Sequence, residues 1–274
     1  MTAETARPIV WTADLHMHRL EEREFLRFAA EVDRLKPAAL LLAGDISRAK
    51  DLSRDWNQMA LSFRDYPLYF VPGNHDYYHG SIDDVDASLE TIHGSFPWIN
   101  VLHGTEVVPI SEECALVGHR GWGDGLAGNA RRSMVHVNDF MYIEELRKCE
   151  DRNALFDRLE SLGREAAERL AQVLPEALGR FQTVLVLTHA PPFPEACLYE
   201  GKASSPDYLP HFCCASVGQI LVKLANRFPD RRIQVLCGHT HHGCEYSPVR
   251  NLQVSVAASD YGRAKVHRLD LSLI

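Results

Sequence analysis

The stretch Ala39-Leu40-Leu41-Leu42-Ala43-Gly44-Asp45 is an apolar run that ends in a glycine and a carboxylate. A short apolar run with such an end predicts a buried β-strand. Four more polar motifs follow apolar runs in the same way. They are Asp14-Leu15-His16, Gly73-Asn74-His75-Asp76, Thr188-His189 and Gly238-His239-Thr240-His241, after the runs 9–11, 68–71, 184–187 and 233–236. Because the carboxyl ends of strands build the ligand sites of α/β sheets, the motifs together predict one site.

The residue types in these motifs suit divalent metal ions. Carboxylate oxygens and neutral imidazoles bind borderline ions such as manganese, iron(II), zinc and nickel. One carboxylate can place an oxygen on each of two ions, and the amide oxygen of Asn74 is a neutral ligand that leaves such ions strongly electrophilic. Two ions about 3.5–4 Å apart can generate hydroxide, bind phosphate oxygens and offset developing charge. The motifs therefore predict a dinuclear centre for phosphate-ester chemistry.

With these motifs present in order, the sequence resembles the calcineurin-like metallophosphoesterases over about residues 8–242. The resemblance implies an α/β fold, a four-layer αββα sandwich of two facing mixed sheets flanked by helices. It also implies seven metal ligands: Asp14, His16 and His241 on the first ion, Asn74, His189 and His239 on the second, and Asp45 bridging both. His75 would face the leaving group as a general acid or charge stabiliser, and Asp76 would orient His75.

Several potential ligands lie beside this set. His18 and His242 neighbour predicted ligands, and we expect them at the rim of the site. His79 follows the turn that carries His75, and a place in the pocket is one alternative for it. Cys244 is near the metal-binding turn, but the ligand set is complete without it. The sequence leaves the roles of these four residues open.

Composition indicates a single soluble enzyme domain over residues 1–274. With 46% hydrophobic residues, the chain can bury a large core, and its net charge of −8 argues against a nucleic-acid surface, which is usually basic. No run is long enough to span a membrane, and the first residues lack the pattern of a secretory signal. An odd count of seven Cys without a C-x-x-C pair indicates reduced thiols and a cytoplasmic location. The oligomeric state is not indicated.

Hydrophobic spacing predicts helices and further strands between the motifs. We expect helices at 21–35, 52–63, 83–92 (capped by Ser81) and 216–228, a long helical region at 144–178 hinged near Gly163, and strands at 99–102 and 114–117. The tail predicts two strands, 253–257 and 264–269, that form a hairpin around 259–262.

Two irregular segments, 119–140 and 190–212, are rich in Gly, Pro and aromatic residues, and we expect them to set specificity. Arg131 and Arg132 are candidates for a substrate anion, because a guanidinium matches phosphate oxygens. Trp122 and Tyr199 are candidates for shaping the pocket. A small group of bacterial phosphohydrolases has a similar H-x-P-P-F stretch with Y/H-E-G and L-P-x-F downstream, a likeness that names no substrate.

The function that the sequence favours is that of a metal-dependent hydrolase of small phosphate mono- or diesters, a phosphatase or phosphodiesterase. A bridging hydroxide would attack phosphorus in line, using two ions of manganese, iron, zinc or nickel. Ile46-Ser47-Arg48 after Asp45 departs from the V-D-R-G stretch of the Ser/Thr protein phosphatases. The lipid A diphosphatases carry Arg where His75 stands. Two alternatives remain: a DNA/RNA nuclease of the same superfamily, which predicts a basic groove, and a non-catalytic interaction module, which predicts a broken ligand set.

Overall fold

The structure is a computed structural model that describes residues 7–269. Within these residues, two larger sheets face each other, with strand orders β13-β1-β2-β3-β4 and β11-β12-β10-β7-β6-β5. The first sheet contains β1 (Ile9–Thr12), β2 (Ala39–Leu42), β3 (Leu68–Phe70), β4 (Ile99–Val101) and β13 (His267–Leu269). The second contains β5 (Val108–Pro109), β6 (Cys114–Gly118), β7 (Thr183–Leu187), β10 (Arg232–Cys237), β11 (Cys244–Val249) and β12 (Leu252–Val256).

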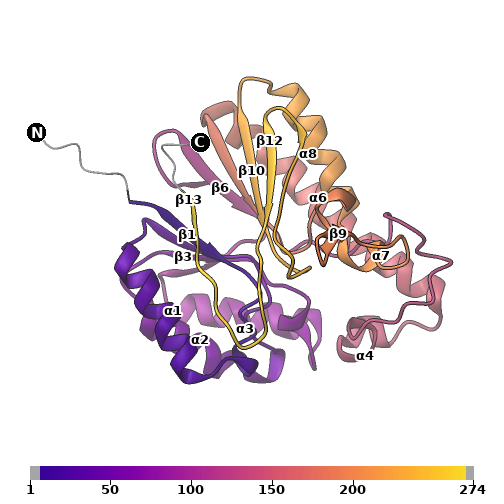
Figure 1. Cartoon of the computed structure of the whole chain (residues 1–274), viewed down its shortest axis with the longest axis horizontal. Helices are drawn as coiled ribbons and strands as arrows, with labels where there is room; N and C mark the ends of the chain where they lie inside the picture. The colour runs from indigo at the N-terminus through magenta and orange to yellow at the C-terminus, as the bar shows by residue number, and fades with distance from the viewer. Residues whose placement is uncertain (1–6, 270–274) are drawn as a thin grey trace, which may run out of the picture.

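Helices cover the outer face of each sheet. The first sheet packs against α1 (Glu22–Leu35), α2 (Leu52–Ser62) and α3 (Ile82–Ser95), and the second against α6 (Arg152–Arg180) and α8 (Ala215–Arg227) (Figure 1). The arrangement confirms the predicted four-layer α/β sandwich. Ser81 caps α3 as expected, because its hydroxyl accepts a hydrogen bond of 3.1 Å from the Asp84 amide.

The central strands are apolar throughout because both of their faces are buried. In β2, Leu40 and Leu42 pack against α1–α3, whereas Leu41 lies between the two sheets. In β7, Val184 and Val186 pack toward α6 and α8, and the alternate leucines point between the sheets. This two-sided burial explains why the strands read as continuous apolar runs rather than alternating ones. Packing on both faces also holds the carboxyl ends of these strands, and hence the polar motifs that follow them, in defined positions.

Short elements form the connections. They are the helices α4 (Asp139–Tyr142), α5 (Glu144–Arg147) and α7 (Leu209–Phe212), the strands β8 (Leu198–Tyr199) and β9 (Lys202–Ala203), and the 3-10 turns η1 (Met17–Arg19), η2 (Ala49–Asp51), η3 (His75–Tyr77) and η4 (Pro194–Ala196). Within residues 7–269, no helix combines the length and the apolar character that crossing a membrane requires.

Two predictions about the elements are wrong. The region 144–178 is not divided into two helices at Gly163, because α6 continues without interruption from Arg152 to Arg180, with the side chain of Asp151 capping its start. Gly163 instead allows close packing: a Cβ there would lie 2.4 Å from the Cβ of Asp124. The tail strands form no hairpin with each other, because β12 joins β10 and β11 in the second sheet while β13 pairs with β1 in the first. The sequence pattern also gave no indication of β11.

Candidate metal centre

The polar motifs meet at one edge of the sandwich, where the carboxyl ends of strands from both sheets converge. Asp14, Asp45 and Asn74 follow β1, β2 and β3 of the first sheet. His189 and His239 follow β7 and β10 of the second sheet. Because the two sheets face each other, ligands that are distant in sequence reach a common point.

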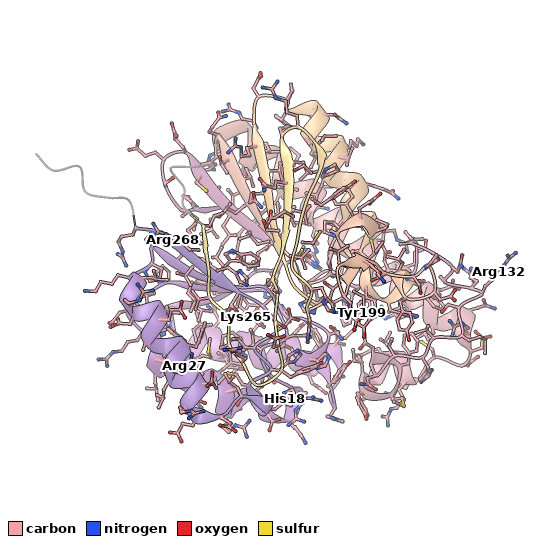
Figure 2. The ribbon with its side chains drawn as sticks, viewed as in Figure 1. His18, Arg27, Arg132, Tyr199, Lys265 and Arg268 are labelled. Atoms are coloured by element: carbon pink, nitrogen blue, oxygen red, sulfur yellow. The ribbon has the colours of Figure 1, made fainter. Side chains whose placement is uncertain are left out.

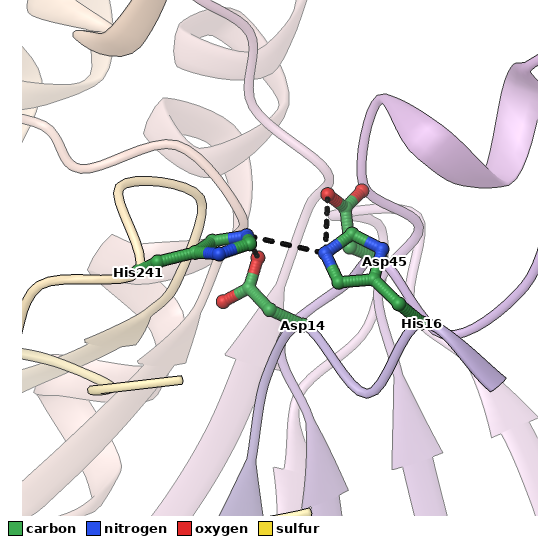
Figure 3. Close-up of side chains that lie close together, drawn as sticks. All are labelled: Asp14, His16, Asp45 and His241. Atoms are coloured by element: carbon green, nitrogen blue, oxygen red, sulfur yellow. Dashed lines mark hydrogen bonds and ion pairs between the residues drawn. The ribbon is translucent and has the colours of Figure 1, made fainter. Parts of the chain in front are cut away.

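The first group of potential ligands comprises Asp14, His16, Asp45 and His241, whose donor atoms all lie within 4.8 Å of one another (Figure 3). The Nε2 atoms of His16 and His241 are 3.1 Å apart. The Nε2 atom of His16 lies 3.8 Å from Oδ2 of Asp45, and that of His241 lies 3.5 Å from Oδ1 of Asp14. Imidazole and carboxylate donors therefore point at a common centre.

The second group comprises Asp45, His189 and His239, again within 4.8 Å. The Nε2 atom of His189 lies 3.3 Å from Oδ1 of Asp45 and 3.0 Å from Oδ1 of Asn74. Asp45 belongs to both groups, with Oδ2 toward His16 and Oδ1 toward His189. One carboxylate oxygen thus faces each group, which is the arrangement that a bridging ligand requires.

Hydrogen bonds to the backbone orient two of the histidines. Nδ1 of His189 donates to the carbonyl oxygen of Ala43 over 2.8 Å, which leaves the Nε2 lone pair directed into the site. Nε2 of His239 donates to the carbonyl oxygen of His211 over 2.9 Å, which leaves Nδ1 as its ligand atom. Carbonyl partners of this kind fix the tautomer and ring orientation of metal-binding histidines.

Burial and neighbouring charges shift the pKa values of the carboxylates and imidazoles in the cluster. Burial opposes ionisation of Asp45, but the imidazoles of His189 and His75 lower its pKa well below the usual range. Burial lowers the pKa of His16 to about 3, so its ring is neutral and one ring nitrogen has a lone pair that can bind a metal ion. Burial also lowers the pKa of His189, yet the carboxylate of Asp45 outweighs this effect and raises it to about 9. A cation that binds His189 must therefore displace a proton.

The donor set fits divalent metal ions. Two ring nitrogens only 3.1 Å apart, those of His16 and His241, cannot both donate, so a proton or a cation must lie between them. Nδ1 of His16 is buried and has no hydrogen-bond partner within the described chain. Imidazole nitrogens, carboxylate oxygens and one amide oxygen are ligands shared by manganese, iron, zinc and nickel, so the set does not distinguish among these ions.

The backbone of the site is strained where ligands occur. Five of these residues have positive φ angles although none is glycine: Asp14 (55°), His16 (43°), Asp45 (58°), His239 (72°) and His241 (62°). Such left-handed residues cost free energy and cluster at functional sites. Two motif glycines permit the close approach, because a Cβ on Gly73 would lie 2.2 Å from Oδ1 of Asp45 and one on Gly238 2.4 Å from Oδ2 of Asp14.

His75 borders both groups without joining either. Its backbone N–H donates to Oδ1 of Asp45 over 2.8 Å, and its Nε2 lies 3.9 Å from Oδ2 of the same carboxylate. The ring stacks on Tyr78, with centroids 4.1 Å apart and an angle of 24° between the planes. The side chain remains 17% exposed, so a substrate can reach it from solvent.

The expectation that Asp76 orients the ring of His75 is wrong in its geometry. The carboxylate of Asp76 is fully buried and accepts hydrogen bonds of 2.7–3.1 Å from four backbone amides, those of Asp45, Ile46, Ser47 and Gly73. These bonds tie the loop after β2 to the turn that carries Asn74 and His75. Asp76 therefore organises the backbone around Asp45, and the rings that contact His75 include those of Tyr78 and His16.

Sequence reasoning missed Asp139, which lies in the irregular segment 119–140. Its Oδ1 atom accepts a hydrogen bond of 2.9 Å from the amide nitrogen of Asn74 and one of 2.6 Å from the hydroxyl of Tyr78. The first bond leaves Oδ1 of Asn74 free to face His189. No local pattern marks Asp139, because its partners are 61 and 65 residues away.

The candidate substrate residues have different surroundings. Arg131 pairs with Asp157 (3.2 Å) and Asn153 (2.9 Å) of α6, outside both ligand groups. Arg132 lies at the outer edge of the molecule, well away from His18 and Tyr199 (Figure 2). Trp122 is buried against Tyr77, and Tyr199 is exposed beside His242, with ring centroids 5.1 Å apart. The structure thus brings Tyr199 near the candidate metal-binding turn 238–241 but does not bring Arg131 there.

The residues with open roles lie at the periphery of the cluster. His18 is partly buried beside His16, with ring centroids 5.8 Å apart. His79 packs on Tyr142, at 4.7 Å. The thiol of Cys244 contacts the carbonyl oxygen of Glu195 at 3.8 Å and belongs to neither ligand group.

A model of the calcineurin-like phosphoesterase family matches residues 7–243, and the chain belongs to that family. It is 24% identical over 214 residues to protein L509 of Acanthamoeba polyphaga mimivirus, covering 76% of this chain and 73% of L509. The solved structure of TT1561 of Thermus thermophilus is similar with a TM-score of 0.58 at 14% identity, covering 98% and 96% of the two chains. The structure of a dimetal phosphatase from Danio rerio is similar with a TM-score of 0.55 at 13% identity, covering 92% of this chain and 87% of that phosphatase. These structural likenesses support the fold.

Proposed function

We propose that this protein hydrolyses small phosphate mono- or diesters with two divalent metal ions. Asp14, His16 and His241 would hold one ion, Asn74, His189 and His239 would hold the other, and Asp45 would be shared by both. The observation that carries the proposal is the position of Asp45, whose two carboxylate oxygens face separate groups of donors. The dimetal phosphatase of similar fold from Danio rerio is consistent with this proposal.

When bound, the ions supply Lewis acidity toward the phosphoryl oxygens and lower the pKa of the water they bind. We assign His75 to the leaving group, because its ring borders both donor groups and is open to solvent. A protonated His75 donates from a ring nitrogen to the departing oxygen, while stacking on Tyr78 limits the rotation of the ring.

Metal analysis of the purified protein and a substrate panel test the proposal together. The panel contains p-nitrophenyl phosphate, bis(p-nitrophenyl) phosphate, cyclic nucleotides and nucleotide sugars, each with manganese, iron, nickel or zinc. We expect two ions per chain and hydrolysis of at least one ester. Asp45→Asn should lower occupancy of both sites, whereas the control Asp157→Asn, which alters an exposed carboxylate on α6, should leave both filled. A single bound ion in the intact protein would contradict the dinuclear centre.

A further inference from the structure

A cavity of about 540 Å³ opens beside the second ligand group. One of its lining residues, Thr240, lies between the ligands His239 and His241 in sequence. Another, Phe212, has its ring centroid 5.1 Å from that of His239. The cavity therefore begins at the metal-binding turn, and a group attached to a phosphate at the metal centre has space to enter it.

A β-hairpin forms one wall of the cavity. Strands β8 and β9 pair in register, with Leu198 opposite Ala203 and Tyr199 opposite Lys202. The two turn residues, Glu200 and Gly201, both have positive φ angles, 49° and 74°. Tight hairpin turns of type I′ require positive φ at both positions, so the local sequence suits this turn. The hairpin holds Tyr199 at the rim, facing His242.

Aromatic rings dominate the opposite wall. Tyr208 and Phe212 are one helical turn apart at α7, and their rings are nearly parallel, with an angle of 17° and centroids 6.3 Å apart. Tyr208 is 49% exposed and Tyr199 is 62% exposed. Exposed aromatic residues gathered around a hollow are typical of binding sites. The hydroxyls of Ser204 and Ser205 add polar groups to the lining.

We infer that this cavity binds a planar aromatic ring carried by the substrate's phosphate ester, as in an aryl or a nucleoside phosphate. The inference rests on the proposed function, because the ring enters beside the metal centre. A phosphoryl group alone does not fill such a volume, and the ring faces of Tyr199, Tyr208 and Phe212 offer stacking surfaces. Stacking of one base on an aromatic residue strengthens binding by roughly 5- to 150-fold.

Matched substrates isolate the ring from the chemistry of the ester. Adenosine 5′-monophosphate and ribose 5-phosphate share the same 5′ ester and differ at the anomeric carbon, which carries adenine in the first and a hydroxyl in the second. Benzyl phosphate and cyclohexylmethyl phosphate differ only in the planarity and π-system of the ring. For the metal-loaded protein, we expect the aromatic member of at least one pair to have a KM lower by about tenfold. A preference in the first pair alone identifies a nucleoside pocket, and a preference in both identifies a general aryl pocket. Equal KM values within both pairs overturn the inference.

Variants locate the preference in this cavity. Tyr208→Ala should bring the KM ratio of the aromatic pair close to one, whereas Tyr208→Phe should keep the ratio because the ring remains. The control Leu61→Ala removes an exposed side chain of α2, 74% exposed, and should also keep it. A preference that survives Tyr199→Ala, Tyr208→Ala and Phe212→Ala, each in a folded, metal-loaded variant, overturns the assignment to this cavity.

A binding measurement separates this inference from the proposed function. Benzylphosphonate and methylphosphonate carry a carbon–phosphorus bond that a phosphoesterase does not cleave. Titration calorimetry should give tighter binding of benzylphosphonate, weakened at least about fivefold by Tyr208→Ala. If no ester is hydrolysed but this dependence is observed, the proposed function fails and the aromatic pocket stands. If esters are hydrolysed and both phosphonates bind alike, the function stands and the pocket is overturned.

Discussion

The amide nitrogen of Asn74 donates a hydrogen bond of 2.9 Å to the carboxylate of Asp139. The same carboxylate oxygen accepts from the hydroxyl of Tyr78, whose ring stacks on His75. One buried acid, at the start of the short helix α4, thus positions both the candidate metal ligand Asn74 and the aromatic support of the proposed acid catalyst. This relationship explains why the amide oxygen of Asn74 faces His189 rather than solvent.

We therefore predict that Asp139→Ala weakens the second metal site more than the first. The substitution leaves the amide of Asn74 and the hydroxyl of Tyr78 without their partner, so Asn74 can rotate. Loss of a group that orients a ligand typically costs about 10- to 100-fold in metal affinity. Competitive metal titration of both sites measures the effect. Tyr78→Phe is the matched control, since it removes only the hydroxyl and should retain both metals. Equal weakening of the two sites by Asp139→Ala would contradict a role specific to Asn74.

A second prediction concerns His75. His75→Asn should keep both metals, because His75 belongs to neither ligand group, but should lower kcat by roughly 10²–10⁴-fold. The loss should be larger for alkyl phosphates than for p-nitrophenyl phosphate, because p-nitrophenolate departs without needing a proton. Steady-state kinetics on both substrates, with metal content measured on the same preparation, provide the test. Equal losses on the two substrates would assign His75 to phosphate binding, and loss of metal would assign it to the structure of the centre.

The ligand groups could be predicted from sequence because each candidate ligand lies within four residues of the carboxyl end of a strand, and the fold brings these strand ends together. Asp139 and the carbonyl group of His211 could not, since their roles depend on where the short helices α4 and α7 pack against the centre. The prediction for the tail failed for a related reason. The local sequence of β12 and β13 is compatible with a hairpin, but β12 pairs with β10 and β11 in one sheet and β13 pairs with β1 in the other. Gly163 resembled a hinge because glycine is a poor helix former, whereas its role is close packing against Asp124.

The third prediction revises the expectation for the arginines. Arg131→Ala and Arg132→Ala, singly and together, should leave KM unchanged for both a monoester and a diester. The guanidinium of Arg131 is engaged by Asp157, and that pair is exposed, so its loss should also change the free energy of unfolding by less than about 1 kcal/mol. Kinetics with p-nitrophenyl phosphate and its bis-ester provide the measurement. A selective rise in KM for the monoester would restore the arginines to the substrate site.

The fourth prediction concerns acid stability and His119, a buried residue outside the ligand groups. Burial lowers the pKa of His119 from 6.5 to about 3, with a further contribution from the charge of Arg120. Between pH 6.5 and about 3, His119 binds a proton in the unfolded state but not in the folded state. The free energy of unfolding therefore falls as the pH drops through this range. One such group contributes a slope of at most about 1.4 kcal/mol per pH unit.

His119→Gln removes this titration while keeping a side-chain oxygen that can accept from the amide of Gly121, as Nδ1 of His119 does at 3.5 Å. Urea unfolding between about pH 6.5 and 4.5, inside the window where the two states differ in bound protons, compares the two proteins, with a chelator present so that metal binding does not contribute. The variant should have a lower free energy of unfolding at neutral pH, because it replaces a buried, packed side chain. On acidification it should lose less of this free energy than the original protein, because it lacks the His119 titration. Some loss should remain, because the other buried histidines are present in both proteins. Parallel pH profiles would show that His119 takes up its proton over the same pH range in the folded and unfolded states, and would contradict the lowered pKa.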